Sequence, residues 1–324
     1  MRADDMNTML TTILIVLAVT LAALGFWLWT PDLPRDRLEA RYFAPDGAYV
    51  DVDGVRLHVR DTGPRGAPAI IMLHRLGSSL HTWQGWAEAL DDRYRVVRFD
   101  LPAHGLTGAD PAGDYSIGRW VALLDGLMDT LGLESAALIG NSMGGRLAWT
   151  MAAKRPARVS ALVLVSPDGF ESPGFEYGRS PDVPALMGLM RYTLPAFMLR
   201  SNVEIAYADK SALGDDVFRR YRDMMRAPGN RAALVDMMGQ VMLVPPEPLL
   251  AQIEAPTLLV WGERDRMIPA TNAQDYLNGI DGAKLVGFPD LGHVPHEEAP
   301  ARSLPPVADF LDRHLAGRGD PDSG

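Results

Sequence analysis

The chain has 324 residues, of which 47% are hydrophobic and 22% charged, values typical of a globular protein long enough to bury a large core. Its formal net charge is −10, from 31 basic and 41 acidic residues, which argues against a nucleic-acid partner because such a partner calls for a basic face. The chain has no cysteine, so disulfides, thiol catalysis and cysteine-zinc sites are excluded.

The first thirty residues differ from the rest of the chain. The stretch from Leu10 to Trp29 carries no charge, and at about 20 residues and roughly 30 Å it matches one hydrocarbon core. Aromatic rings cluster at its end, where amphipathic side chains favour the headgroup level, and Pro31 then stops the helix. We expect residues 1–30 to be a transmembrane helix that is retained as a single-pass membrane anchor.

A cleaved signal peptide is the competing interpretation of this segment. Arg2 is offset by Asp4 and Asp5, and no small-x-small cleavage site follows the apolar run, so a signal peptide fits less well. The arginines after the span favour a cytoplasmic domain, but a long folded domain can cross a membrane regardless of flanking charge. The side of the membrane is therefore left open.

Strand-like and helix-like segments alternate after a polar linker at residues 31–48. This alternation predicts an α/β fold with a mostly parallel eight-stranded sheet and helices on both faces, built from residues 49–167 and 251–316. Residues 317–324 are expected to be a flexible tail. The expected strands cover residues 49–53, 55–61, 69–73, 95–99, 135–139, 159–165, 257–261 and 284–288.

Residues 168–250 interrupt the alternation. They show helical periodicity without a strand pattern, and they hold several prolines and half of the 16 methionines. Because the segment falls between two core strands, we expect it to be a helical lid over the loops that carry function. Most of its methionines are expected to fill a core, although methionine also lets an apolar pocket adapt to varied ligands.

The turn from Gly140 to Gly144 is the most informative short motif. An apolar strand precedes it and a helical segment follows it, so Ser142 sits where a strand breaks sharply into a helix. Such a turn strains the serine backbone, requires small residues two positions away, and exposes the hydroxyl beside a helix N-terminus. The motif therefore predicts a nucleophilic serine.

Two residues after the lid supply partners for this serine. Asp265 follows the strand at residues 257–261, and His293 follows the last strand. A serine hydroxyl needs a base to take its proton, and the base needs an orienting acid. The chain order serine, aspartate, histidine is the order that a nucleophile elbow requires.

These features together resemble the α/β-hydrolase superfamily over residues 49–316. The resemblance rests on the segments GNSMGG, WGERDRMIP, GHVPHEE and HRLGSS. It implies that Ser142 is the nucleophile, Asp265 the acid and His293 the general base. His104 and His296 are rival bases and Glu263 is a rival acid, each matching the family pattern less well.

The resemblance also implies an oxyanion hole formed by the backbone N–H groups of Met143 and Leu76. Here the chain departs from the family, because His74-Arg75 stands where histidine-glycine is usual. Arg75 either points outward and is harmless, or places a guanidinium near the pocket mouth where it pairs with a substrate carboxylate.

Carboxylic ester hydrolysis through an acyl-enzyme is the function that the resemblance implies, with a small hydrophobic ester as substrate. The elbow also resembles that of carbon–carbon bond hydrolases of aromatic degradation, although Val294 stands where those often have tryptophan after the base. A cofactor-free haloperoxidase activity and a non-catalytic ligand-binding scaffold stay open as alternatives. No metal cluster, phosphate loop or dinucleotide fingerprint is present, so no cofactor is expected.

Overall fold

The computed structural model describes residues 3–171, 176–179 and 183–315. Eight strands form one sheet in the order β1-β2-β4-β3-β5-β6-β7-β8. The pairs β1–β2 and β2–β4 are antiparallel, and every other pair is parallel, as the sequence predicts. The strands are β1 (Gly47–Val52), β2 (Val55–Thr62), β3 (Ala69–Leu73), β4 (Arg95–Phe99), β5 (Ala136–Asn141), β6 (Val159–Val165), β7 (Thr257–Gly262) and β8 (Lys284–Phe288).

Helices cover both faces of the sheet. Successive side chains of a strand point to opposite faces, and the central strands are apolar on both faces, so both faces are buried. In β3, Ile70 and Met72 pack in one buried cluster, while Ile71 and Leu73 pack in another. The first cluster includes side chains from the 3₁₀ helix η1 (Leu80–Trp83), α3 (Gln84–Leu90) and α13 (Pro305–Leu315). The second includes side chains from α4 (Ile117–Thr130), α5 (Met143–Lys154) and α10 (Asn272–Gly279).

The loops expected to carry function lie at one edge of the sheet. Strands β3, β5, β6, β7 and β8 are parallel, so the segments that follow them all begin at the same edge. In open α/β sheets this carboxyl edge is where ligands bind. The short elements η2 (Pro156–Arg158), α11 (Pro295–Glu298) and α12 (Pro300–Ser303) lie outside the sheet.

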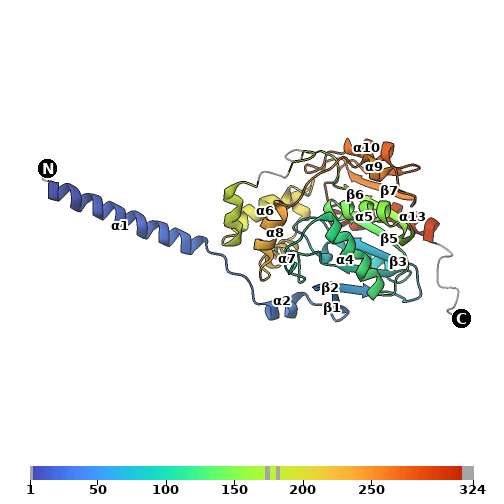
Figure 1. The fold of residues 1–324 in the computed structure, drawn as a ribbon, viewed down its shortest axis with the longest axis horizontal. Coiled ribbons are helices and arrows are strands. Elements are labelled where there is room, and N and C mark those ends of the chain that lie inside the picture. The colour runs from blue at the N-terminus through green and yellow to red at the C-terminus, as the bar shows by residue number, and fades with distance from the viewer. Residues whose placement is uncertain (1–2, 172–175, 180–182, 316–324) are drawn as a thin grey trace.

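Among its described residues, the predicted lid segment consists of short helices joined by loops, with isolated bridges at Tyr177 and Thr193. Its methionines divide between roles, since Met237 is fully buried whereas Met198 and Met242 are exposed. Figure 1 shows α6, α7 and α8 on the side of the sheet from which α1 projects. The lid elements are η3 (Ala185–Arg191), α6 (Ala196–Glu204), η4 (Lys210–Ala212), α7 (Asp215–Met225), α8 (Asn230–Met238) and α9 (Glu247–Leu250).

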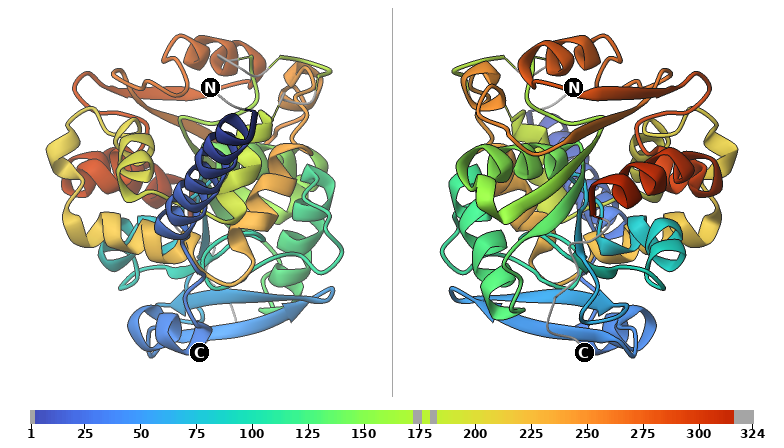
Figure 2. Two further views of the ribbon diagram at one scale, coloured as in Figure 1. Left: turned by 90° about the vertical axis from the view of Figure 1, so that its left-hand side faces the viewer. Right: turned by 90° about the vertical axis from the view of Figure 1, so that its right-hand side faces the viewer.

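Helix α1 (Ala3–Leu28) projects from the body as a single rod (Figures 1 and 2). Its segment from Asp5 to Leu28 is long and apolar enough to cross a membrane, and none of the most apolar stretch is buried. The expected span ran through Trp29, but Trp29 leaves the helix and forms an isolated bridge with Thr193 of the lid.

The segment expected to be a linker is partly a folded element, which corrects that prediction. Residues Arg35–Tyr42 form α2, and Leu38 is 1% exposed in a small cluster with Leu33, Leu106 and Met224. Burial of Leu38, together with the bonds from Arg35 to the carbonyl of Leu106 and from Arg41 to Asp223, holds the helix against the body. The predicted tail at residues 317–324 lies outside the described residues.

Candidate functional site

Ser142 occupies a strained turn between β5 and α5. Its backbone has φ 53° and ψ −119°, a conformation that non-glycine residues rarely adopt, which confirms the predicted elbow. A Cβ atom on Gly140 would lie 2.2 Å from the carbonyl oxygen of Gly144, and one on Gly144 would lie 2.2 Å from that of Leu73. The two glycines are therefore needed so that the turn can close against β3.

Asp265 and His293 form a buried pair. The Nδ1–H of His293 donates to Oδ2 of Asp265 at 2.7 Å, and both side chains are fully shielded from solvent. Oδ1 of Asp265 accepts from the N–H groups of Met267 and Ile268 at 2.7 and 2.9 Å. Burial acts to raise the pKa of Asp265, but His293 and these two N–H groups outweigh it and hold the pKa below its usual value.

The second ring nitrogen of His293, Nε2, is not used in a hydrogen bond within the described part of the chain. Nε2 is also buried. Because Nδ1 carries the proton donated to Asp265, Nε2 is the nitrogen with a free lone pair. This arrangement leaves His293 able to accept a proton on the side away from Asp265.

Asn141 ties the loop of His293 to the elbow. Its Nδ2 donates to the carbonyl oxygens of His293 and Val165 at 3.0 and 2.9 Å. The residue directly before Ser142 therefore fixes both the base loop and the end of β6. This role could not be read from the sequence, because the residue before the serine is unrestricted in the G-x-S-x-G motif.

The lid also holds the base loop. The N–H of His293 donates to the carbonyl oxygen of Ala206 at 2.7 Å. Glu298 accepts from the N–H groups of Gly292 and Asp209 at 2.7 and 2.8 Å. Two segments far apart in the sequence thus set the backbone position of His293 together.

The loop after β3 lies against the N-terminus of α5, as the predicted oxyanion hole requires. A Cβ on Gly144 would meet the carbonyl of His74 at 2.7 Å, which measures how closely the two segments approach. Met143 is the first residue of α5, where N–H groups have no partner within a helix. The N–H of Leu76 makes no hydrogen bond to the described residues. The role of these two N–H groups stays a prediction.

Two neutral histidines brace this loop. His74 donates from Nδ1 to the carbonyl of Arg75 at 2.8 Å and accepts at Nε2 from the N–H of Leu101 at 3.0 Å. His104 donates to the carbonyl of Pro102 and accepts from the N–H of Gly77 at 2.9 Å. Burial lowers the pKa of His104 to about 3, so the ring stays neutral. His104 is therefore a structural residue, as its sequence position suggests.

Arg75 lies inside the protein, which rules out the outward-facing interpretation. It is 5% exposed; its guanidinium lies 5.4 Å from the centre of the Tyr221 ring in α7, and its Nη1 donates to the carbonyl of Leu76 at 3.1 Å. Burial acts to lower its pKa, but Tyr221 and Glu297 outweigh that effect and raise it. Arg75 thus connects the loop after β3 to the predicted lid. Its proposed contact with a substrate carboxylate stays a prediction.

The remaining rivals have other partners. His296 stacks on Trp83 at 3.9 Å between ring centres, and its Nε2 bonds Thr82 Oγ1 at 3.1 Å. Glu263 is exposed and lies against Gly287 of β8. Neither residue contacts His293 or Ser142 through the hydrogen bonds of the described residues, so the geometry favours Asp265 and His293.

Asp168 is a further acidic residue beside the elbow that the sequence analysis missed. Its N–H donates to the carbonyl of Ser142 at 3.0 Å, and its Oδ2 lies 3.9 Å from Nη1 of Arg146. Burial raises its pKa, while Arg146 and His293 act in the opposite direction. The sequence Pro167-Asp168-Gly169 is typical of a turn, so only the fold reveals its position.

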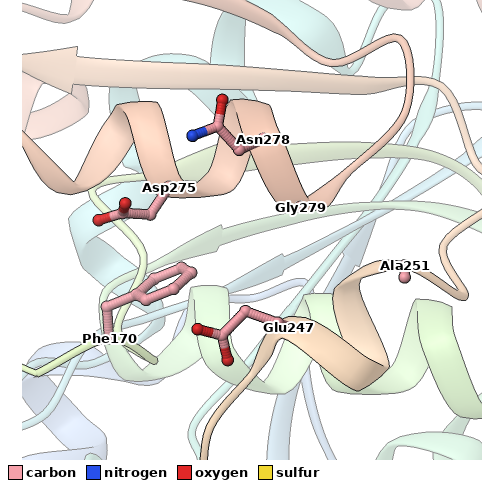
Figure 3. Close-up of a pocket in the computed structure, with 6 residues that line it drawn as sticks. All are labelled: Phe170, Glu247, Ala251, Asp275, Asn278 and Gly279. Carbon is pink, nitrogen blue, oxygen red and sulfur yellow. The ribbon is translucent and has the colours of Figure 1, made fainter.

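One pocket of about 370 Å³ lies away from these residues, between α9 and α10. Figure 3 shows the side chains of Phe170, Glu247 and Asp275 at this space, and none of the predicted site residues lines it. Among the described residues, no group of three or more histidine and acidic side chains is arranged to hold a metal ion.

Comparison with known proteins agrees with this architecture. A model of the alpha/beta hydrolase fold family matches residues 68–300. A putative 2-succinyl-6-hydroxy-2,4-cyclohexadiene-1-carboxylate synthase of Bacillus subtilis is 33% identical, with 80% of this chain and 96% of the relative covered. A 2-hydroxy-6-oxononadienedioate/2-hydroxy-6-oxononatrienedioate hydrolase of Pseudomonas putida is 32% identical, with 79% and 92% covered.

Solved structures show the same fold. A meta-cleavage product hydrolase from Pseudomonas fluorescens superposes with a TM-score of 0.71 at 25% identity, covering 82% of this chain and 98% of that one. A bacterial membrane phospholipase A superposes with a TM-score of 0.71 at 24% identity, covering 95% and 98%. The family model spans most of the chain, and the mostly parallel eight-stranded sheet with helices on both faces agrees with the fold that it names. The chain therefore belongs to the α/β-hydrolase family and is a hydrolase of that fold.

Proposed function

We propose that the protein is a membrane-anchored serine hydrolase that cleaves carboxylic esters through Ser142, His293 and Asp265. The observation that carries the proposal is the 2.7 Å bond from His293 to Asp265, with Nε2 of the same ring left unpartnered within the described part of the chain. A histidine oriented in this way is suited to deprotonate a serine on the adjoining elbow.

The proposed reaction has two steps. Nε2 of His293 takes the proton of Ser142, whose Oγ bonds to the ester carbonyl carbon while the carbonyl electron pair moves to oxygen. The N–H groups of Met143 and Leu76 hold that oxyanion. The carbon–oxygen bond to the alcohol then breaks, and His293 gives its proton to the departing alcohol. In the second step, His293 takes a proton from a water molecule, whose oxygen bonds to the acyl carbon. The bond from that carbon to Ser142 Oγ then breaks, His293 returns the proton to Ser142, and the acid is released.

A panel of p-nitrophenyl esters of graded acyl length tests this proposal. We expect hydrolysis of at least the medium-length esters, and a preference for these over acetate if the lid covers an apolar pocket. The Ser142→Ala variant is the control. Absence of turnover with every ester, from a folded sample, would overturn the ester assignment.

Carbon–carbon bond hydrolysis is the second candidate. Two relatives, 32% and 31% identical to this chain, are named 2-hydroxy-6-oxononadienedioate/2-hydroxy-6-oxononatrienedioate hydrolases. The discriminating assay offers 2-hydroxy-6-oxononadienedioate, the compound named for one of them, beside the preferred p-nitrophenyl ester. A higher kcat/KM for the dienedioate would favour the second candidate over the first.

A further inference from the structure

The lid carries a concentration of exposed apolar side chains on η3 and α6. Leu186 and Phe197 are 72% and 71% exposed, and Leu189, Tyr192 and Met198 are each at least half exposed. Beyond residue 30, only Ile205, Met242, Val244 and Leu285 join them as exposed large hydrophobic residues in the described part of the chain. Such a concentration on a soluble surface indicates an interaction site. We call residues 186–198 the apolar face.

Helix α1 meets the body at this same face. The rings of Trp29 and Tyr192 stack at 6.3 Å between centres. The N–H of Thr30 donates to the carbonyl of Tyr192 at 3.0 Å, and Oγ1 of Thr193 donates to the carbonyl of Leu28 at 2.7 Å. Figure 2 shows α1 standing in front of the lid helices when the molecule is viewed from this side. The apolar face is therefore continuous with the segment that could cross a membrane.

A basic group lies next to this junction. Nε of Arg226 donates to the carbonyl of Pro31 at 3.0 Å, close to the end of α1. Arg37 is exposed and Arg222 and Arg226 are partly buried, whereas Arg231 is only 3% exposed. Asp32 pairs with Arg231, and Asp223 pairs with Arg41. Arginines placed just beyond a transmembrane span favour anionic headgroups.

We propose that the apolar face rests in the interface of an anionic phospholipid bilayer, with Leu186 and Phe197 reaching the acyl boundary and with Arg37 and Arg226 at the phosphates. The stacked rings of Trp29 and Tyr192 then lie at the headgroup level, where amphipathic aromatic rings are favoured. This inference rests on the proposed membrane anchor and deepens the proposed function, because it names amphiphilic esters of the bilayer as the substrate class.

The bilayer-facing segment is also coupled to the candidate site. Helix α6, which carries Phe197, ends at Glu204, and the carbonyl of Ala206 directly beyond it accepts from the N–H of His293. An ester whose acyl chain leaves the bilayer beside α6 thus reaches the edge of the sheet where the site residues lie. Entry from this side removes the need for the acyl chain to cross water.

The absence of cysteine allows a direct test on the full chain. Single substitutions Leu17→Cys, Leu186→Cys, Phe197→Cys and Leu285→Cys each carry a fluorophore, and the protein is reconstituted in vesicles of phosphatidylcholine and phosphatidylglycerol. Lipids bearing nitroxides then quench only probes in the bilayer. We expect strong quenching at positions 17, 186 and 197 and little at 285, an exposed position on β8.

The outcomes separate the face from the anchor. Quenching at 17 but not at 186 and 197 overturns the apolar face and leaves the anchor intact, whereas quenching at 186 and 197 but not at 17 supports the face and overturns the anchor. If fluorophores at position 197 of two protein molecules contact each other and lipid nitroxides do not quench them, a second copy of the chain covers the face. That result overturns the proposal.

An activity measurement tests the substrate class. The Leu186→Ser, Phe197→Ser double variant should lose several-fold in turnover of a vesicle-embedded ester and keep its kcat/KM for a short water-soluble ester. Leu285→Ser is the matched control and should change neither. An equal loss on both esters in the double variant would contradict entry from the bilayer.

Discussion

Asn141 and Asn230 are both buried asparagines whose side-chain N–H groups donate to two backbone carbonyls, so a variant of Asn230 is a matched control for one of Asn141. Nδ2 of Asn141 donates to two carbonyls at the site, and Nδ2 of Asn230 donates to the carbonyls of Gly105 and Met224, away from the site. Both asparagines are buried, so replacing either with alanine removes two buried hydrogen bonds and costs about 1–3 kcal/mol of unfolding free energy.

Only Asn141→Ala should also change catalysis. We expect its kcat to fall by roughly tenfold to a hundredfold, because the loop of His293 loses its tie to the elbow and a displacement of about 1 Å can cost about 10²-fold. Asn230→Ala should keep its kcat. Equal activity of the two variants at equal loss of stability would show that Asn141 is merely structural.

The choice between Asp265 and Glu263 gives the second prediction. Asp265→Asn removes the acceptor that fixes the tautomer of His293, so kcat should fall by roughly 10³–10⁴-fold on the preferred ester. Glu263→Gln should keep nearly full activity because its carboxylate is exposed and contacts β8. A large loss in the Glu263 variant with a small one in the Asp265 variant would reverse the assignment.

At the scale of elements, Arg75 joins the loop after β3 to α7. We expect Arg75→Gly to lower kcat for acidic and neutral esters alike, because the loop loses its contact with Tyr221. The loss should be smaller than the roughly 10²–10³-fold cost of removing one oxyanion donor. Arg220→Met is the control, since Arg220 pairs with Glu297 at 2.5 Å but lies outside the loop. A rise in KM confined to acidic esters would instead support a contact with a substrate carboxylate.

The strands and flanking helices could be predicted because each carries a continuous apolar run or a clear helical period. Helix α2 could not be predicted, since only Leu38 of a segment rich in charged residues is buried. The contact between Ala206 and His293 also escaped prediction, because it joins segments that are distant in sequence through backbone atoms alone. The sequence motifs thus identified the candidate residues but not the groups that hold them.

At the scale of the whole molecule, Asp100 connects separate parts of the core. Its carboxylate accepts from the N–H groups of Leu80 and Leu106 at 2.7 and 2.8 Å and from Nδ1 of His58 at 2.7 Å. Burial acts to raise the pKa of Asp100, but the bond to His58 helps hold it well below the usual value. A carboxylate with a depressed pKa contributes stability above its unfolded pKa of about 3.9, and this stability is lost as the pH falls further.

Asp100→Asn should therefore lower the free energy of unfolding at neutral pH by about 3–5 kcal/mol, since an amide cannot accept all three bonds. The deficit relative to the unmodified chain should shrink as the pH falls below about 4. Urea unfolding over a pH series measures both effects. Asp129→Asn is the control, because its partner Arg158 forms an exposed pair worth little. A deficit that is independent of pH would contradict the role of the ionised carboxylate.

The proposed reaction depends on Ser142 being a nucleophile that His293 activates. The most direct measurement is labelling of the folded full chain with a fluorophosphonate probe, followed by mass spectrometry of the modified peptide. We predict one adduct on Ser142, no labelling of Ser142→Ala, and strongly slowed labelling of His293→Ala. A probe adduct on another residue, or ester hydrolysis retained by pure Ser142→Ala, would contradict the account.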